Sequence, residues 1–320
     1  MLVSVVVPTY RRPDLLERCL AALADQEFDP SAFEVIVADD AANESTRRQV
    51  EGWAGRSPIL IRYTAPTTAH GPAAARNAGW REARGEIIAF TDDDCIPAPR
   101  WLAEGVAAFA GGTAAVAGRV VVPIPERPTD YERDTAGLER AEFVTANCFV
   151  RRDVLADIGG FDVRYATAWR EDSDLHFSLL KRGDPIRRAP GAIVVHPARP
   201  ARWGISLWQQ RRSLYNALLF KKSPRLYRVR IQSSPPWNYY AIVMSIAVMF
   251  FAAIRGRPGP AMVAAGIWAV LTAESCARRL HRNSLAPRHV AEMAVTSALI
   301  PPLSVFWRIY GALRFRVFFL

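Results

Sequence analysis

Short apolar segments rich in β-branched residues alternate with segments of helical periodicity along the first 100 residues of the chain. The apolar segments lie at residues 2–7, 34–38, 59–63 and 87–91, and the helical ones at residues 13–24, 44–54 and 72–83. Strands that alternate with helices of this length form βαβ units, whose parallel strands are covered by helices on both faces. The alternation therefore predicts an α/β fold with a mostly parallel sheet flanked by helices.

Polar side chains follow three of these predicted strands. Thr9 and Tyr10 follow the first strand, Asp39 and Asp40 the second, and Asp92, Asp93 and Asp94 the fourth. The carboxyl ends of parallel strands share one edge of a sheet, and ligands of open α/β sheets bind there. We therefore expect a ligand site at this edge.

The usual phosphate-binding loops are missing from the sequence. It contains neither GxGxxG nor GxxxxGK[ST], so a dinucleotide oxidoreductase and a P-loop ATPase lose their main support. Three consecutive carboxylates can instead hold a divalent cation that bridges a diphosphate. The alternative is an acidic turn that caps a helix near residues 99–109. The position of the triplet, beside other polar strand ends, favours the metal.

Five segments together resemble a family 2 glycosyltransferase with the GT-A fold. They are SVVVPTYRRPDLLERCLAAL, FEVIVADD, GPAAARNAGWREARGEIIAFTDDDCIP, NCFVRRDVLADIGGFD and WREDSDLHFSLLKRG. The resemblance covers about residues 1–196, with the motifs in the order of the family. It implies a nucleotide-diphosphate sugar as the donor and inversion at the anomeric carbon.

The resemblance also implies which residues bind the donor. Asp92, Asp93 and Asp94 take the place of the DxD motif, with Asp94 as a metal ligand, Asp92 as a ligand of the metal or a contact to the ribose or a metal-bound water, and Asp93 on the donor side. The other expected donor contacts are Pro8, Thr9 and Tyr10 around the nucleobase, Asp39 or Asp40 at its edge, and Arg76 near the diphosphate. The expected cation is Mg²⁺ or Mn²⁺. His196 is either a further metal ligand or a structural histidine, Arg76 could be a surface arginine, and Tyr10 could be an aromatic residue at the edge of the core.

On the acceptor side, Glu171 and Asp172 match the ED motif of the family. Asp172 is the expected catalytic base, because an inverting transfer needs a carboxylate that takes the proton of the acceptor hydroxyl. Capping of the helix that follows is an alternative role for Asp172. Glu171 and Asn147 are expected to contact the acceptor. Gln209 and Arg212 resemble an incomplete QxxRW motif in which Ser213 replaces the tryptophan, which favours a non-processive enzyme.

The composition changes after residue 236. Residues 237–320 contain nine arginines and two glutamates in otherwise apolar sequence, a pattern typical of membrane helices with basic flanks. We expect two spans at about residues 238–254 and 259–277, and a third segment at about 289–313 that Pro301 and Pro302 kink or make re-entrant. A buried soluble hairpin is the alternative. The predicted organisation is a catalytic domain over residues 1–200, interfacial helices and a linker over 201–236, and membrane helices over 237–320.

The sequence thus predicts a multi-pass protein of the inner, cytoplasmic membrane with its catalytic domain in the cytoplasm. Four cysteines far apart in the sequence suit a reducing compartment, and the amino terminus lacks the pattern of a signal peptide. The expected partners are a nucleotide sugar, a lipid-linked or saccharide acceptor and the membrane, without nucleic acid. Two alternatives stay open: an inactive nucleotide-sugar-binding or scaffold protein, and a nucleotidyltransferase.

Overall fold

A computed structural model describes residues 1–319, which form two compact units. The first unit contains residues 1–123 and 136–198, and the second contains residues 124–135 and the chain from Arg199 onward. Nothing in the sequence predicted that residues 124–135 belong with the C-terminal part of the chain.

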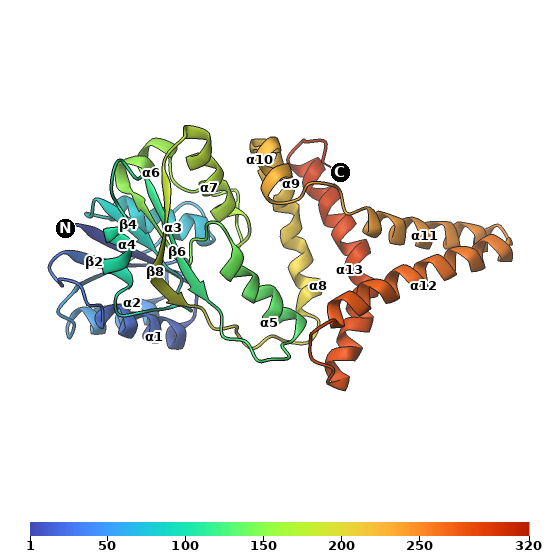
Figure 1. The fold of residues 1–320 in the computed structure, drawn as a ribbon, viewed down its shortest axis with the longest axis horizontal. Helices are drawn as coiled ribbons and strands as arrows, with labels where there is room; N and C mark the ends of the chain where they lie inside the picture. The colour runs from blue at the N-terminus through green and yellow to red at the C-terminus, as the bar shows by residue number, and fades with distance from the viewer. Residues whose placement is uncertain (320) are drawn as a thin grey trace. The chain divides into compact units, whose positions relative to one another are not determined.

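The first unit is built on one eight-stranded sheet with the order β3-β2-β1-β4-β7-β6-β8-β5 (Figure 1). The strands are β1 Val3–Thr9, β2 Phe33–Asp39, β3 Leu60–Thr64, β4 Ile87–Phe90, β5 Ile96–Pro97, β6 Ala115–Val121, β7 Cys148–Arg151 and β8 Ile186–Val195. Strands β1 to β4 are parallel to one another, β7 is antiparallel to both β4 and β6, and β8 is parallel to β6. The sheet is therefore mixed, and β1, β2, β4 and β8 all end at the same edge.

Helices cover both faces of this sheet, as the alternating pattern predicted. They are α1 Pro13–Ala24, α2 Glu44–Ala54, α3 Pro72–Glu82, α4 Trp101–Ala107, α6 Arg152–Ile158 and α7 Glu171–Arg182, with the short 3₁₀ helix η1 Ala136–Arg140. Along β1, Val5 and Val7 pack with residues of α1 on one face, whereas Val6 packs with α3 and α7 on the other. Full burial of such a side chain contributes about 1.5–3 kcal/mol, so both helical layers stabilise the central strands.

The second unit is entirely helical within the described residues. It contains α5 Asp130–Thr135, α8 Ile205–Gln209, the 3₁₀ helix η2 Gln210–Ser213, α9 Leu214–Lys222, α10 Pro224–Arg230, α11 Trp237–Ile254, α12 Pro258–Leu280 and α13 Pro287–Arg314. Arg279 of α12 joins three of these helices, because it donates hydrogen bonds of 2.7 Å to Asp130 of α5 and 2.7 Å to Thr296 of α13. This contact explains why residues 124–135 fold with the C-terminal helices.

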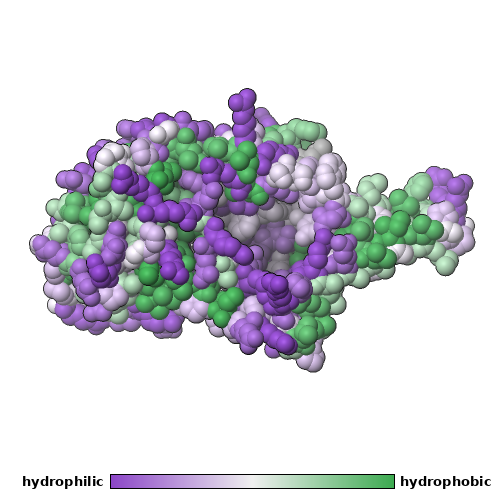
Figure 2. Space-filling model, in the orientation of Figure 1, coloured by the Kyte–Doolittle hydropathy of each residue, from purple (hydrophilic) through white to green (hydrophobic). Residues whose placement is uncertain are grey.

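Three helices, α11, α12 and α13, are long and apolar enough to cross a membrane. Figure 2 shows hydrophobic residues along the α11–α12 hairpin and hydrophilic residues at its turn, where Arg255 and Arg257 lie. Pro301 and Pro302 lie inside α13, which is assigned as one helix through both prolines. A kink there, or a dip of this segment into the membrane, stays a prediction.

Candidate functional site

The residues predicted to bind the donor lie at the shared carboxyl edge of the sheet. Thr9 ends β1, Asp39 ends β2, the carboxylate triplet follows β4, and His196 follows β8. The backbone N–H of His196 donates a hydrogen bond of 2.8 Å to the carbonyl oxygen of Val121 in β6, which holds His196 at this edge. The edge that the sequence predicted as a ligand site therefore gathers four strand ends in one place.

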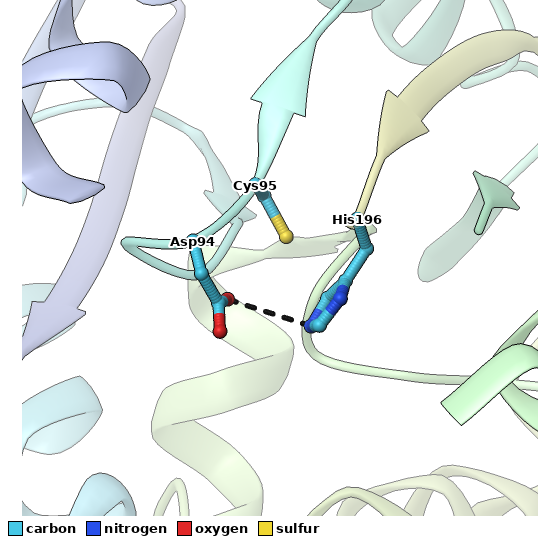
Figure 3. A group of neighbouring side chains, drawn as sticks. All are labelled: Asp94, Cys95 and His196. Atoms are coloured by element: carbon cyan, nitrogen blue, oxygen red, sulfur yellow. Dashed lines mark ion pairs between the residues drawn. The ribbon is translucent and has the colours of Figure 1, made fainter. Parts of the chain in front are cut away.

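Asp94 and His196 form the pair best suited to bind a cation. The Nε2 atom of His196 lies 3.4 Å from the Oδ1 atom of Asp94, and both side chains are largely buried. Figure 3 shows the two side chains turned toward each other, with the sulfur of Cys95 beside them. Burial raises the pKa of the Cys95 thiol well above its usual value.

Asp93 points away from this pair and joins two loops. It accepts a hydrogen bond of 2.8 Å from the hydroxyl of Thr9 and one of 3.1 Å from the guanidinium of Arg12. Its side chain is almost fully buried, and burial raises its pKa to about 6, against the opposing effect of Arg12. Asp93 thus fastens the loop after β4 to the loop after β1.

Arg76 connects the triplet to the ED pair. Its Nη2 atom donates to Asp92 at 2.6 Å, and its Nη1 atom donates to Glu171 at 3.1 Å. The guanidinium is 3% exposed, whereas Asp92 remains 26% exposed. Both terminal nitrogens of Arg76 are therefore bonded to carboxylates, so a surface position is excluded.

Glu171 and Asp172 begin α7 but have different surroundings. Glu171 is buried, and burial raises its pKa to about 7 although Arg76 lowers it. Asp172 is half-buried, and its Oδ1 atom accepts a hydrogen bond of 2.6 Å from the N–H of Ser173. Arg170, directly before the pair, has a φ of +76°, a left-handed conformation that costs a non-glycine residue about 1–2 kcal/mol. Of the two carboxylates, Asp172 is the one that solvent reaches.

The two aspartates after β2 shape the neighbouring loops. Asp39 is buried and accepts hydrogen bonds from the N–H groups of Ala41 and Asn43, at 3.0 and 2.7 Å. Asp40 accepts one of 2.8 Å from the N–H of Gly71. Asp39 therefore holds its own turn, and Asp40 fixes the loop before α3.

Tyr10 and Pro8 occupy different positions in the first loop. Tyr10 is 49% exposed, so its ring is available for contact with a ligand and is not part of the core. Pro8 is buried within β1, where it pairs with Ala38 of β2. Only Tyr10 of the two presents its side chain to solvent.

Asn147, predicted to contact the acceptor, lies in the core of the first unit instead. The indole N–H of Trp101 donates to its Oδ1 atom at 2.9 Å. Its Nδ2 atom donates to the backbone carbonyls of Arg119 at 2.9 Å and Ala192 at 2.8 Å. These bonds occupy a side chain that is 0% exposed, so Asn147 ties β6 and β8 to α4 and is not a lining residue of a pocket.

Gln209 and Arg212, also predicted to contact the acceptor, belong to the second unit. Gln209 ends α8, and Arg212 lies in η2. Both are partly buried. Their role in acceptor binding stays a prediction.

Sequence reasoning missed the bridge from Arg76 to Asp92 and Glu171. A signal for it was present, because Arg76 stands in the run PAAARNAG, whose small residues indicate a closely packed helix. An arginine in such a helix needs carboxylate partners, since burial of an unpaired charge is costly. Which carboxylates would pair with it required the fold.

Comparison with known proteins gives consistent matches. The model of the family described as "Glycosyl transferase family 2" matches residues 4–170. The chain is 32% identical over 213 residues to glycosyltransferase AglE of Haloferax volcanii, covering 62% of this chain and 67% of AglE. It is 39% identical over 111 residues to validoxylamine A glucosyltransferase of Streptomyces hygroscopicus subsp. limoneus, covering 34% of this chain but only 24% of that relative.

Among solved structures, the chain is similar to the mannosyltransferase PcManGT from Pyrobaculum calidifontis, solved in complex with GDP-Man and Mn²⁺. The TM-score is 0.57 at 25% sequence identity, and the match covers 98% of this chain and 86% of PcManGT. The likeness therefore extends over both units of the chain.

Proposed function

The chain belongs to glycosyl transferase family 2, and from this premise we propose that it transfers a sugar, with inversion, from a nucleotide-diphosphate donor to an acceptor hydroxyl group near a membrane. It is a glycosyltransferase by its family. The family match favours this activity over nucleotidyl transfer, and the presence of all the carboxylates named above favours it over an inactive scaffold.

One observation carries the proposal. Asp92 of the triplet and Glu171 of the ED pair are far apart in the sequence, yet both bind the guanidinium of Arg76. The motif assigned to the donor and the motif assigned to the acceptor therefore belong to one site. A transferase needs this arrangement, because the attacking hydroxyl and the anomeric carbon must be held within contact distance.

The side chains at this edge of the sheet fit a divalent cation. Asp94 offers a carboxylate oxygen and His196 an imidazole nitrogen, with ligand atoms close enough to share one ion. Asp92, which is partly exposed on the same loop, is proposed to contact a metal-bound water or the ribose. A bound Mg²⁺ or Mn²⁺ supplies charge stabilisation for the leaving nucleoside diphosphate. The Mn²⁺ in the PcManGT complex supports the proposal of a divalent cation.

Asp172 is the proposed base. Its carboxylate is reachable from solvent and lies in the first turn of α7. It would take the proton of the acceptor hydroxyl as that oxygen attacks the anomeric carbon. Glu171, next to Asp172, is buried and is proposed to stabilise the acceptor side of the site through its bond to Arg76. Tyr10, Thr9 and the loops held by Asp39, Asp40 and Asp93 border the donor.

The acceptor is proposed to be amphipathic, a lipid-linked saccharide or glycolipid. The support is the set of three apolar helices in the same chain as the transferase domain. Nucleotide sugars are cytosolic, so the first unit would face the cytoplasm at the inner membrane. Gln209 and Arg212 would contact the acceptor, and Ser213, in place of an aromatic platform, favours non-processive transfer.

A thermal-shift screen of the full chain in detergent tests the function. UDP-, GDP- and dTDP-sugars are added singly with Mn²⁺, and one donor class is expected to stabilise the protein by about 2.7 kcal/mol at 100 times its Kd. Asp94→Asn should abolish this stabilisation. Asp153→Asn, at an exposed acidic residue paired with Arg151, is the control and should retain it. Absence of stabilisation and of donor hydrolysis with every nucleotide sugar would contradict the proposal.

A further inference from the structure

The helix that carries Arg76 is fixed at both ends. At its start, Gly71 has a φ of +104°, and a Cβ there would lie 2.6 Å from the carbonyl oxygen of Ala166. Near its end, a Cβ on Gly79 would lie 2.4 Å from a methyl group of Val6 in β1. No larger side chain fits at either place without movement of the neighbours, so α3 is packed directly on the sheet and on the loop before α7.

Asn77, the residue after Arg76 in α3, attaches a neighbouring turn to this helix. Its Nδ2 atom donates to the carbonyl oxygen of Phe161 at 2.7 Å, and its Oδ1 atom accepts from the N–H of Phe161 at 2.9 Å. The turn at residues 159–162 is thereby attached to α3 through both backbone groups of one residue. Asp162 of that turn accepts bonds from Arg164, at 3.1 Å from the backbone N–H, and so caps the turn locally.

Arg76 likewise attaches two further segments to α3, the loop after β4 and the start of α7. Its planar guanidinium presents its donors in a fixed geometry, and one terminal nitrogen is used for Asp92 and the other for Glu171. Its remaining nitrogen, Nε, is buried. Each terminal nitrogen carries a second N–H group, but the side chain of Arg76 is only 3% exposed, so a ligand has little access to it. The expected position of Arg76 near the diphosphate stays a prediction, and the contacts that the structure shows are those to Asp92 and Glu171.

We propose that Arg76 is a positioning residue, which sets the loop after β4 and the start of α7 at a fixed separation through its bonds to Asp92 and Glu171. The inference rests on the proposed function, because it assigns the two loops to the two sides of the transfer. A lysine cannot replace the arginine fully, since one ammonium group lacks the two forked donor atoms that reach both carboxylates. Loss of the bridge would also leave two neighbouring carboxylates without their shared cation.

The experiment compares Arg76→Gln and Arg76→Lys with Arg81→Gln. Arg81 lies on the same helix and is exposed, so its variant controls for loss of an arginine from α3. UDP and GDP, each with Mn²⁺, are the binding probes, and whichever binds the wild type is used. Donor turnover is measured in parallel. Misplacement of reacting groups by about 1 Å can cost about 100-fold in rate, so Arg76→Gln should lower kcat by about that factor, while the nucleotide Kd changes much less.

A double-mutant comparison separates positioning from direct binding. If Arg76 acts through Glu171, Arg76→Gln should have a much smaller effect on kcat in a Glu171→Gln background than in the wild type. Arg76→Lys should restore part of the lost turnover, because it can still reach one carboxylate. A weakening of nucleotide binding by about 100-fold, equal in both backgrounds, would overturn the proposal and assign Arg76 to the diphosphate.

Hydrogen–deuterium exchange provides a readout that needs no activity. Peptides covering residues 91–97 and 167–175 should both exchange faster in Arg76→Gln, and as slowly as the wild type in Arg81→Gln. If Arg76→Gln fails to fold, the same comparison is made with Arg76→Lys. Unchanged exchange of both peptides would overturn the inference, whereas an inactive wild type with the expected exchange pattern would contradict only the proposed function.

Discussion

The hydroxyl of Thr9 donates a hydrogen bond of 2.8 Å to the carboxylate of Asp93, and this bond turns the middle member of the carboxylate triplet into the protein. Its neighbours on either side point elsewhere: Asp94 toward His196 and Asp92 toward Arg76. Three consecutive aspartates therefore do three different things. Asp93 is bonded to Thr9, Asp94 faces His196, and Asp92 is bonded to Arg76.

Thr9→Val tests the anchoring role of Asp93. The variant keeps the shape of the side chain but removes the donor, so Asp93 loses one of its two bonds in a buried position. An unsatisfied buried acceptor costs about 1–3 kcal/mol, and we expect the melting temperature of the first unfolding transition to fall accordingly. Thr67→Val, at an exposed loop position, is the control. Equal melting temperatures for the two variants would show that the bond to Thr9 is not a stabilising contact.

His196→Ala tests the cation site. Removal of one of two neighbouring ligands should raise the Mn²⁺ concentration needed for half-maximal donor hydrolysis by at least about 10-fold, since even loss of an outer-shell partner costs 10–100-fold in metal affinity. His281→Ala, at an exposed histidine of the second unit, should leave the requirement unchanged. Chelation with EDTA should abolish activity in the wild type, and added Mn²⁺ should restore it.

Glu171→Gln tests the pH dependence that follows from its burial. The pKa of Glu171 is about 7 in the folded chain against 4.5 as its ordinary value. The folded state therefore binds more protons than the unfolded state between about pH 4.5 and pH 7, so this group makes stability fall as the pH rises through that window. Well above pH 7 the contribution is constant, because Glu171 is then ionised in both states.

The measurement is the melting temperature of the wild type and of Glu171→Gln at pH 5, 6, 7 and 8. Glutamine cannot ionise, so the fall between pH 5 and pH 7 should be smaller in the variant. Glu142→Gln, at an exposed glutamate of the same unit, should follow the wild type. Parallel curves for Glu171→Gln and the wild type would mean that Glu171 does not change its protonation in this range.

The parallel part of the first unit could be predicted from periodicity, because β1, β2 and β4 are buried along their whole length and form continuous apolar runs in the sequence. The expected strand at residues 34–38 is observed as β2, Phe33–Asp39, and the expected helix at residues 13–24 as α1, Pro13–Ala24. Polar residues at strand ends could likewise be placed at one edge, since parallel strands end together. These inferences need only local sequence and the rule of parallel pairing.

The orientation of individual side chains could not be predicted in the same way. Asn147 lies within a segment that resembles the family. Its amide, however, is hydrogen-bonded to a tryptophan and to two backbone carbonyls from segments far apart in the sequence. Asp93 and Asp94 are adjacent, yet their partners come from β1 and from the residue after β8. Such contacts depend on how loops are placed on the finished sheet, which no local pattern encodes.

Asp172→Asn tests the proposed base. The amide keeps the size of the side chain but cannot accept the hydroxyl proton, and general base catalysis contributes about 10²–10⁴-fold. We expect kcat to fall by at least about 100-fold while the affinity for the nucleotide donor is retained. Asp157→Asn, at an exposed aspartate paired with Arg182, should be as active as the wild type. Turnover by Asp172→Asn near the wild-type level would remove Asp172 from the mechanism.

The arginines that flank the apolar helices predict on which side of the membrane the C-terminus lies. If the first unit is cytoplasmic, α11 leaves the cytoplasm and α12 returns, so the turn between them carries Arg255 and Arg257 outside. The loop after α12 then lies inside with the larger group of arginines, Arg278, Arg279, Arg282 and Arg288, as the positive-inside rule prefers.

A complete crossing by α13 would place Arg314 and Arg316 outside, against that rule, and would set Pro301 and Pro302 at mid-depth, where freed backbone groups lack water. A kinked or interfacial α13 avoids both costs and leaves the exposed Arg314 and Arg316 near anionic head groups, whereas Arg308 is buried and bonded to Gln232. We therefore expect a reporter fused after residue 320 to read as cytoplasmic, like one fused before residue 1. Because a complete third crossing would put the two reporters on opposite sides, a periplasmic or luminal reading at the C-terminus alone would establish three spans.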